Sequence, residues 1–225
     1  MRGKHSAETR FADRWQAGQV LGDALAPLVT DVRPADRVVL GLARGGVVVA
    51  AEVAARLDAI LDAIVIRKVG SPFQPELAVG AVGPEGVRVF NRGVITDLGL
   101  TEPEVRHLTN RVARTRDQLD DELRGGRPAS RLDGKLAILV DDGLATGASM
   151  RAAVAFARRS AESVIVAVPT AAPDMLATFE THGVRTRALM TPVPFGSVGS
   201  WYVDFDEVSS AEVAALLGQH PSSRS

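Results

Sequence analysis

The chain has 225 residues, and its 26 basic and 27 acidic side chains leave a formal charge of −1, which argues against binding to bulk nucleic acid or to an anionic membrane. The absence of cysteine excludes disulfides, thiolate metal sites and a thiol nucleophile. No apolar run reaches transmembrane length and the polar start lacks a signal-peptide pattern, so we expect one cytoplasmic domain over residues 1–225.

Hydrophobic periodicity predicts helices and strands that alternate along most of the chain. The expected helices cover residues 11–29, 47–57, 101–123 and 150–161, and the expected strands cover residues 38–42, 61–66, 136–140, 164–169 and 184–189. This alternation is typical of a mainly parallel, doubly wound sheet with helices on both faces, an α/β fold. Ligands of such sheets lie at the carboxyl ends of the strands.

Residues 70–92 interrupt the alternation, because they are rich in glycine and proline. Two strand-like pieces, 77–82 and 87–90, predict a β-hairpin arm, and residues 71–76 before it are expected to form a mobile loop. The charged helix 101–123 that follows has a narrow apolar seam. A narrow seam is suited to packing against one neighbouring element or against a partner subunit. Aspartates lie close to its arginines, so we interpret its outer faces as solvated.

The most informative segment is residues 137–149, in which an apolar strand ends in Asp141 and Asp142 and a turn then leads into a helix. The turn residues that could approach or bind an anion are Gly143, Ala145, Thr146, Gly147, Ala148 and Ser149. A loop before a helix directs backbone N–H groups and the positive end of the helix dipole at an anion. The two carboxylates would repel phosphate, so they require hydroxyl groups or a divalent cation. A ligand that combines a phosphate group with several hydroxyl groups is a sugar phosphate. The alternative is a structural turn whose aspartates cap the helix.

Two further strand ends carry unusual residues. The first follows the strand 38–42 and opens a helix, and it consists of Ala43, Arg44, Gly45 and Gly46. Its backbone amides and the Arg44 guanidinium could bind a second phosphate group. The alternative is an ordinary tight turn, which has the same pattern. The basic pair Arg67 and Lys68 is expected to end the next strand. Adjacent strand residues point to opposite faces, so geometry would send one of the two toward a ligand. An exposed strand terminus is the alternative.

The string from Ala137 to Ser149 resembles the phosphoribosyl diphosphate (PRPP) signature of the type I phosphoribosyltransferases. Gly143 departs from that signature, because an aliphatic residue is usual there, and it should loosen the turn without removing a ligand. The resemblance implies the fold of that family and a core over residues 38–190. It further implies that Ala43–Gly46 form the pyrophosphate loop, that Arg67 and Lys68 assist the leaving group, and that residues 70–76 close over the ligand.

The resemblance also implies a small hood over the site, for which residues 11–29 and 191–207 are the candidates. The second segment concentrates four aromatic residues, Phe195, Trp201, Tyr202 and Phe205, which could hold a nucleobase or could simply plug one edge of the core. Only the tail, residues 219–225, is expected to be disordered.

By the same resemblance, the chain would use PRPP and Mg²⁺ to transfer phosphoribose to a nitrogenous acceptor, such as a nucleobase, with release of pyrophosphate. Asp141 and Asp142 would hold the ribose hydroxyls and contribute to the Mg²⁺ site, and the turn would bind the 5′-phosphate. The family is compatible with a homodimer, and no nucleic acid or membrane is expected as a partner. One alternative is a non-catalytic PRPP or nucleotide sensor on the same fold. A metal-dependent phosphoesterase ranks last, because His5, His107, His182 and His220 form no ligand spacing.

Overall fold

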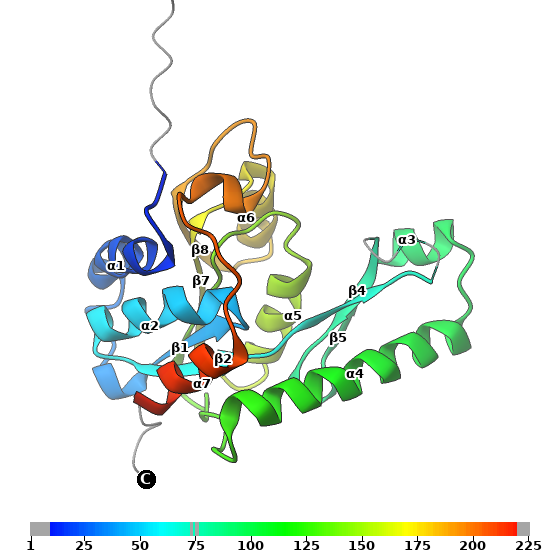
Figure 1. Ribbon diagram of the computed structural model, residues 1–225, viewed down its shortest axis with the longest axis horizontal. Coiled ribbons are helices and arrows are strands. Elements are labelled where there is room, and N and C mark those ends of the chain that lie inside the picture. Colours follow the sequence, from blue (N-terminus) through cyan, green and yellow to red (C-terminus); the bar gives the residue numbers. More distant parts are fainter. Residues whose placement is uncertain (1–9, 73, 75–76, 220–225) are drawn as a thin grey trace, which may run out of the picture.

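A five-stranded parallel sheet forms the centre of the computed structural model, which describes residues 10–72, 74 and 77–219 (Figure 1). Its strands are β1 (Arg37–Leu42), β2 (Ile60–Ile64), β6 (Leu136–Val140), β7 (Ser163–Thr170) and β8 (Arg185–Met190). They lie in the order β2-β1-β6-β7-β8. The chain runs outward from β1 to β2 and then returns to the other side of β1, so the predicted doubly wound parallel sheet is confirmed. The order reverses between β1 and β6, and ligands of doubly wound sheets bind in the crevice at such a point.

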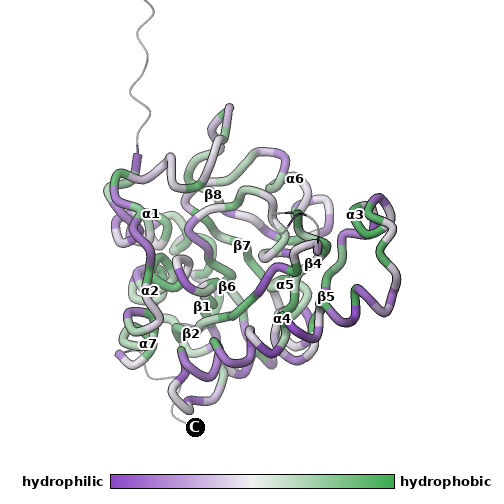
Figure 2. Tube along the Cα trace, turned by 45° about the vertical axis from the view of Figure 1, so that its right-hand side comes forward, coloured by the Kyte–Doolittle hydropathy of each residue, from purple (hydrophilic) through white to green (hydrophobic). Residues whose placement is uncertain are grey.

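Helices cover both faces of this sheet (Figure 1). One face carries α1 (Arg14–Leu25), α2 (Gly45–Leu57) and α7 (Ser210–Gln219), and the other carries α5 (Ala148–Ala157) and α6 (Pro173–Thr181). Alternate strand residues supply the two cores, as period-2 alternation requires: Val39 and Ile138 face α2, whereas Leu40 and Leu139 face α5. In Figure 2 the central strands are mostly apolar, which is expected for a sheet that is buried on both faces.

A second, antiparallel sheet forms an arm that projects from the body (Figure 1). It consists of β3 (Arg67–Gly70), β4 (Ala78–Val82) and β5 (Arg88–Phe90), and it packs against α3 (Arg92–Asp97) and α4 (Glu102–Arg124). The predicted hairpin and long helix are therefore confirmed. Thr101 and Glu104 cap the start of α4: the Glu104 carboxylate accepts a hydrogen bond from the Thr101 backbone N–H at 2.8 Å.

Several predicted boundaries were wrong, and the expected helix 150–161 is α5, Ala148–Ala157. The first helix is shorter than residues 11–29, because Asp13 caps it by accepting a hydrogen bond from the Gln16 N–H at 2.7 Å. The expected strand 61–66 ends at Ile64, and Arg67 starts β3 of the arm instead of ending β2, because the chain crosses here from one sheet to the other. Gln219 is the last residue of α7 and not the first residue of a tail.

Parts of two predictions lie outside the described residues, namely the tail over 220–225 and, within the mobile loop, residues 73, 75 and 76. In the same loop, Ser71 is buried, and its hydroxyl donates to the backbone oxygen of Gln74 at 3.0 Å. No helix among the described residues is long and apolar enough to span a membrane.

Candidate functional site

The loops that follow β1 and β6 touch each other at the carboxyl edge of the sheet. A Cβ atom on Gly46 would lie 2.9 Å from Oδ1 of Asp141, and a Cβ atom on Gly45 would lie 2.2 Å from Oδ2 of Asp142. Both distances are shorter than any normal contact, so only glycine allows the start of α2 to approach the two carboxylates this closely. The structure thus brings together two predicted segments that lie far apart in the sequence.

Each aspartate has a defined partner. Oδ1 of Asp141 accepts a hydrogen bond from the backbone N–H of Asp142 at 2.9 Å. Oδ2 of Asp142 accepts a hydrogen bond from Nε of Arg14 at 2.9 Å, and the two side chains are only 16% and 11% exposed. The Tyr202 hydroxyl donates to the backbone oxygen of Asp142 at 2.6 Å. The carboxylates therefore lie at the edge of the core and are held in place by α1 and by the segment after β8.

Burial dominates the electrostatics of this pair. It raises the pKa of Asp141 well above its ordinary value, and the charge of Asp142 adds to the effect, whereas Lys68 and Arg14 oppose it. Burial also raises the pKa of Asp142, against the opposing charge of Arg14. The pKa of Tyr202 is raised by burial and by the Asp142 carboxylate, so its phenol remains a neutral hydrogen-bond donor. The two aspartates are thus poised to gain from any ligand that supplies cations or hydroxyl donors.

The turn after Asp142 encloses a cavity of about 140 Å³, here called the turn cavity. All the predicted turn residues line it, together with Lys68, Asp141 and Val198. Gly147 has a positive φ of 69°, which favours glycine, and the ten-residue helix α5 starts directly after it. A cavity at a helix N-terminus, with an ammonium group in its wall, is suited to a phosphate group.

A larger cavity of about 460 Å³, here called the arginine cavity, has Arg14, the ion-pair partner of Asp142, in its wall. Ala43, Arg44 and Gly45 of the predicted phosphate loop line it, with Arg14 and Arg67. The peptide bond between Ala43 and Arg44 is cis, and Arg44 forms an ion pair with Glu207. This cavity therefore gathers guanidinium groups from three separate elements.

Arg67 and Lys68 both reach the site, but from opposite sides. Lys68 lines the turn cavity, whereas Arg67 lines the arginine cavity. Their alternate directions follow from strand geometry, as expected. Which of the two meets a ligand stays a prediction, because each lines a different cavity.

Gly143 leaves space for the side chain of a neighbouring segment. A Cβ atom on Gly143 would lie 2.5 Å from Cγ1 of Val198, so the Val198 side chain takes the space that an aliphatic residue would fill. The segment after β8 therefore packs directly on the phosphate turn.

The aromatic residues of the predicted hood divide between the two interpretations. Trp201 and Tyr202 are 6% and 3% exposed and pack with Phe11 at the edge of the core, as the packing alternative states. Phe205 is half-buried in the wall of the arginine cavity, and the Arg14 guanidinium lies 3.8 Å from the centre of its ring.

Arg14 is the residue that sequence reasoning missed. Its Nη1 also donates to the backbone oxygen of Asp206 at 2.8 Å, so it joins α1, β6 and the last loop. One signal was available: a basic residue in the first turn of a helix opposes the helix dipole, and its presence there suggests another role.

Comparison with known proteins identifies the family. Residues 14–182 match the family model described as the phosphoribosyl transferase domain, and the chain therefore belongs to that family. This range includes both loops, Arg14, the basic pair and the two aspartates.

Individual relatives agree with this assignment. In two strains of Mycobacterium tuberculosis, a protein provisionally named a phosphoribosyl transferase is 42% identical over 208 residues, which are 92% of this chain and 46% of that protein. The chain thus spans about half the length of the curated relatives it matches. The crystal structure of TT1426 from Thermus thermophilus is 40% identical, and the match covers 94% of this chain and 99% of that one, with a TM-score of 0.79.

Proposed function

We propose that the protein is a phosphoribosyltransferase that uses PRPP and Mg²⁺ to transfer phosphoribose to a nitrogenous acceptor, such as a nucleobase, with release of pyrophosphate. One observation carries the proposal. Asp141 lines the phosphate-sized turn cavity, and the adjacent Asp142 is paired with Arg14, which lines the arginine cavity. That arrangement matches the order of groups in PRPP, in which the pentose separates a monophosphate from a diphosphate.

The turn cavity would bind the 5′-phosphate. The N-terminus of α5 and the hydroxyls of Thr146 and Ser149 would supply donors, and the Lys68 ammonium would supply charge. The arginine cavity would bind the diphosphate, with Arg44 and Arg67 as charge-assisted donors to the leaving group.

The carboxylates of Asp141 and Asp142 would accept hydrogen bonds from the ribose hydroxyls. Their negative charge would also favour the cationic character that develops on the sugar when the bond to diphosphate breaks. Attack by the acceptor from the opposite side would invert the anomeric carbon, and no covalent nucleophile is needed.

The donor chemistry of the site fits Mg²⁺ in a shared role. The described residues contain no cluster of three or more His, Asp or Glu side chains that could hold a metal. Asp141 and Asp142 offer carboxylate oxygens, and Mg²⁺ commonly takes one or two protein carboxylates and completes its shell with substrate phosphate oxygens and water. When bound, the ion would neutralise charge on the departing diphosphate.

The test is turnover by the purified protein with Mg²⁺-PRPP and a panel of nucleobases, with released pyrophosphate as the readout. Release that depends on one acceptor, and that is lost in Asp141→Asn and Asp142→Asn, supports the proposal. Tight PRPP binding without release for any acceptor would favour the sensor alternative. Absence of PRPP binding by calorimetry would contradict both.

A further inference from the structure

Glu207 places a carboxylate against a residue of the proposed diphosphate site. It forms an ion pair with the guanidinium of Arg44, and both residues line the arginine cavity. A carboxylate beside a phosphate-binding guanidinium opposes binding, because it neutralises the cation and repels the incoming anion. The transfer reaction itself therefore gives no reason for this pair.

The Glu207 carboxylate can leave Arg44 at little cost. The Glu207 side chain is 80% exposed, whereas the Arg44 side chain is 34% exposed. An exposed ion pair of this kind contributes little to stability, because water solvates the charges when the pair opens. Glu207 can thus rotate into solvent while Arg44 stays in the wall of the cavity.

The backbone that carries Glu207 is anchored on both sides. Before it, the backbone N–H of Val203 donates to the backbone oxygen of Phe11 at 2.8 Å. After it, Val208 is buried in the core that α2 and α7 share. Because both anchors lie in the backbone or the core, opening of the ion pair requires only the Glu207 side chain to move.

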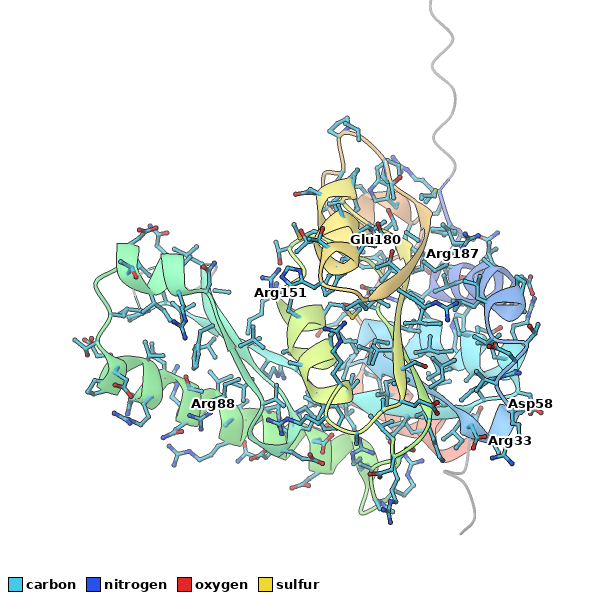
Figure 3. The ribbon with its side chains drawn as sticks, turned by 180° about the vertical axis from the view of Figure 1, so that it is seen from behind. Arg33, Asp58, Arg88, Arg151, Glu180 and Arg187 are labelled. Carbon is cyan, nitrogen blue, oxygen red and sulfur yellow. The ribbon has the colours of Figure 1, made fainter. Side chains whose placement is uncertain are left out.

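The guanidinium next to the phosphate turn has no such partner. Arg151 lies on α5 (Figure 3), and its Nη1 donates to the backbone oxygen of Thr146 at 3.2 Å. Within the part of the chain that the structure describes, Arg151 forms no ion pair with a carboxylate. The paired carboxylate is thus a feature of the arginine cavity and not of every anion-binding element of the site.

We propose that Glu207 is a built-in competitor of the diphosphate group. Its carboxylate holds Arg44 in the absence of ligand and is displaced from that guanidinium when a diphosphate enters the arginine cavity. This competition lowers the affinity for diphosphate, so that the pyrophosphate product leaves more readily. The inference rests on the proposed function, because it assigns the arginine cavity to the diphosphate.

Calorimetric titration with Mg²⁺-pyrophosphate tests the inference. Glu207→Gln removes the competing charge and keeps the shape of the side chain, so pyrophosphate should bind about fivefold more tightly than to the wild type. Ribose 5-phosphate, whose phosphate would occupy the turn cavity, should bind with unchanged affinity.

The matched control is Asp206→Asn. Asp206 also lines the arginine cavity, but its carboxylate forms no ion pair with Arg44. At physiological ionic strength an exposed charge without such a contact is screened, so this variant should tighten pyrophosphate binding by less than about twofold. Circular dichroism verifies that each variant is folded.

A double-mutant cycle separates competition for Arg44 from general repulsion. In the Arg44→Gln background, Glu207→Gln should tighten pyrophosphate binding by less than about twofold, because the contested guanidinium is absent. An effect of the same size with and without Arg44 overturns the inference. So does weaker pyrophosphate binding in Glu207→Gln, which would mean that the carboxylate helps to hold Mg²⁺ instead of competing with the anion.

Turnover of Mg²⁺-PRPP separates this inference from the proposed function. Tighter pyrophosphate binding in Glu207→Gln, in a protein that releases no pyrophosphate with any acceptor, supports the inference and contradicts the transferase. Turnover together with equal pyrophosphate affinity in wild type and Glu207→Gln supports the transferase and contradicts the inference. Absence of pyrophosphate binding to both proteins at about 1 mM also overturns the inference.

Discussion

Arg14 and Asp142 form an ion pair that joins the first helix to the carboxyl end of β6, with Nε of Arg14 2.9 Å from Oδ2 of Asp142. The two residues are 128 positions apart in the sequence, and both side chains are mostly buried. The guanidinium therefore compensates a carboxylate that would otherwise be isolated from water.

Replacing Arg14 with Gln should destabilise the protein by about 3 kcal/mol, because it leaves a mostly buried carboxylate without its cation. Chemical denaturation of wild type and variant measures the difference. The matched control is Arg44→Gln, which removes an exposed pair with Glu207 and should cost less than about 1 kcal/mol. Equal losses in the two variants would contradict the structural role of Arg14.

The raised pKa of Asp141 predicts a specific pH dependence of stability. Its carboxyl has a pKa of about 3.9 in the unfolded chain and a higher value in the fold, so between these two values the folded protein binds more protons. Its contribution to the free energy of unfolding therefore falls as pH rises through that interval. Asp141→Asn should raise the thermal midpoint at neutral pH and flatten this dependence. Calorimetric scans across pH measure both effects. A lower thermal midpoint in the variant at neutral pH would contradict the prediction.

Gly143→Val should destabilise the protein by about 1–3 kcal/mol, because the new side chain would overlap Val198. Val198→Ala in the same chain should recover most of that loss by vacating the space. Thermal unfolding of the two single variants and the double variant completes the cycle. Strict additivity of the single effects would mean that the two side chains do not compete for one space.

The opposite directions of Arg67 and Lys68 predict separable effects on two ligands. Lys68→Gln should weaken binding of ribose 5-phosphate by about tenfold or more and have a smaller effect on Mg²⁺-pyrophosphate, whereas Arg67→Gln should do the reverse. Calorimetric titrations of both variants with both ligands measure this. If each variant weakens both ligands equally, the two cavities do not divide the substrate as proposed.

The sheet could be predicted from the sequence because its strands are short apolar runs separated by helical patterns. The position of the two loops at the switch point could also be predicted, because each follows an apolar strand and leads into a helix. The break between β2 and β3 could not be predicted from the sequence. Residues 61–66 include buried Leu61, Ile64, Val65 and Ile66, so the hydrophobic pattern continues through the point at which the chain changes sheets.

The ion pair of Arg14 with Asp142 could not be predicted for a different reason. An ion pair between residues so far apart leaves no local pattern, and only the folded topology brings the first turn of α1 to the end of β6. The sequence also could not show which aromatic residues of the cluster are buried. Trp201 and Phe205 lie close together in the sequence, yet Trp201 is buried and Phe205 is half-buried.

Lys68 belongs to the arm, whereas the other walls of the turn cavity belong to the body and to Val198. The chain enters the arm through Val65 and Ile66 and leaves it at the end of α4, where Arg124 forms an ion pair with Asp62 of β2. Because Lys68 is part of β3, the placement of the arm on the body fixes how far its ammonium group lies from the N-terminus of α5 opposite.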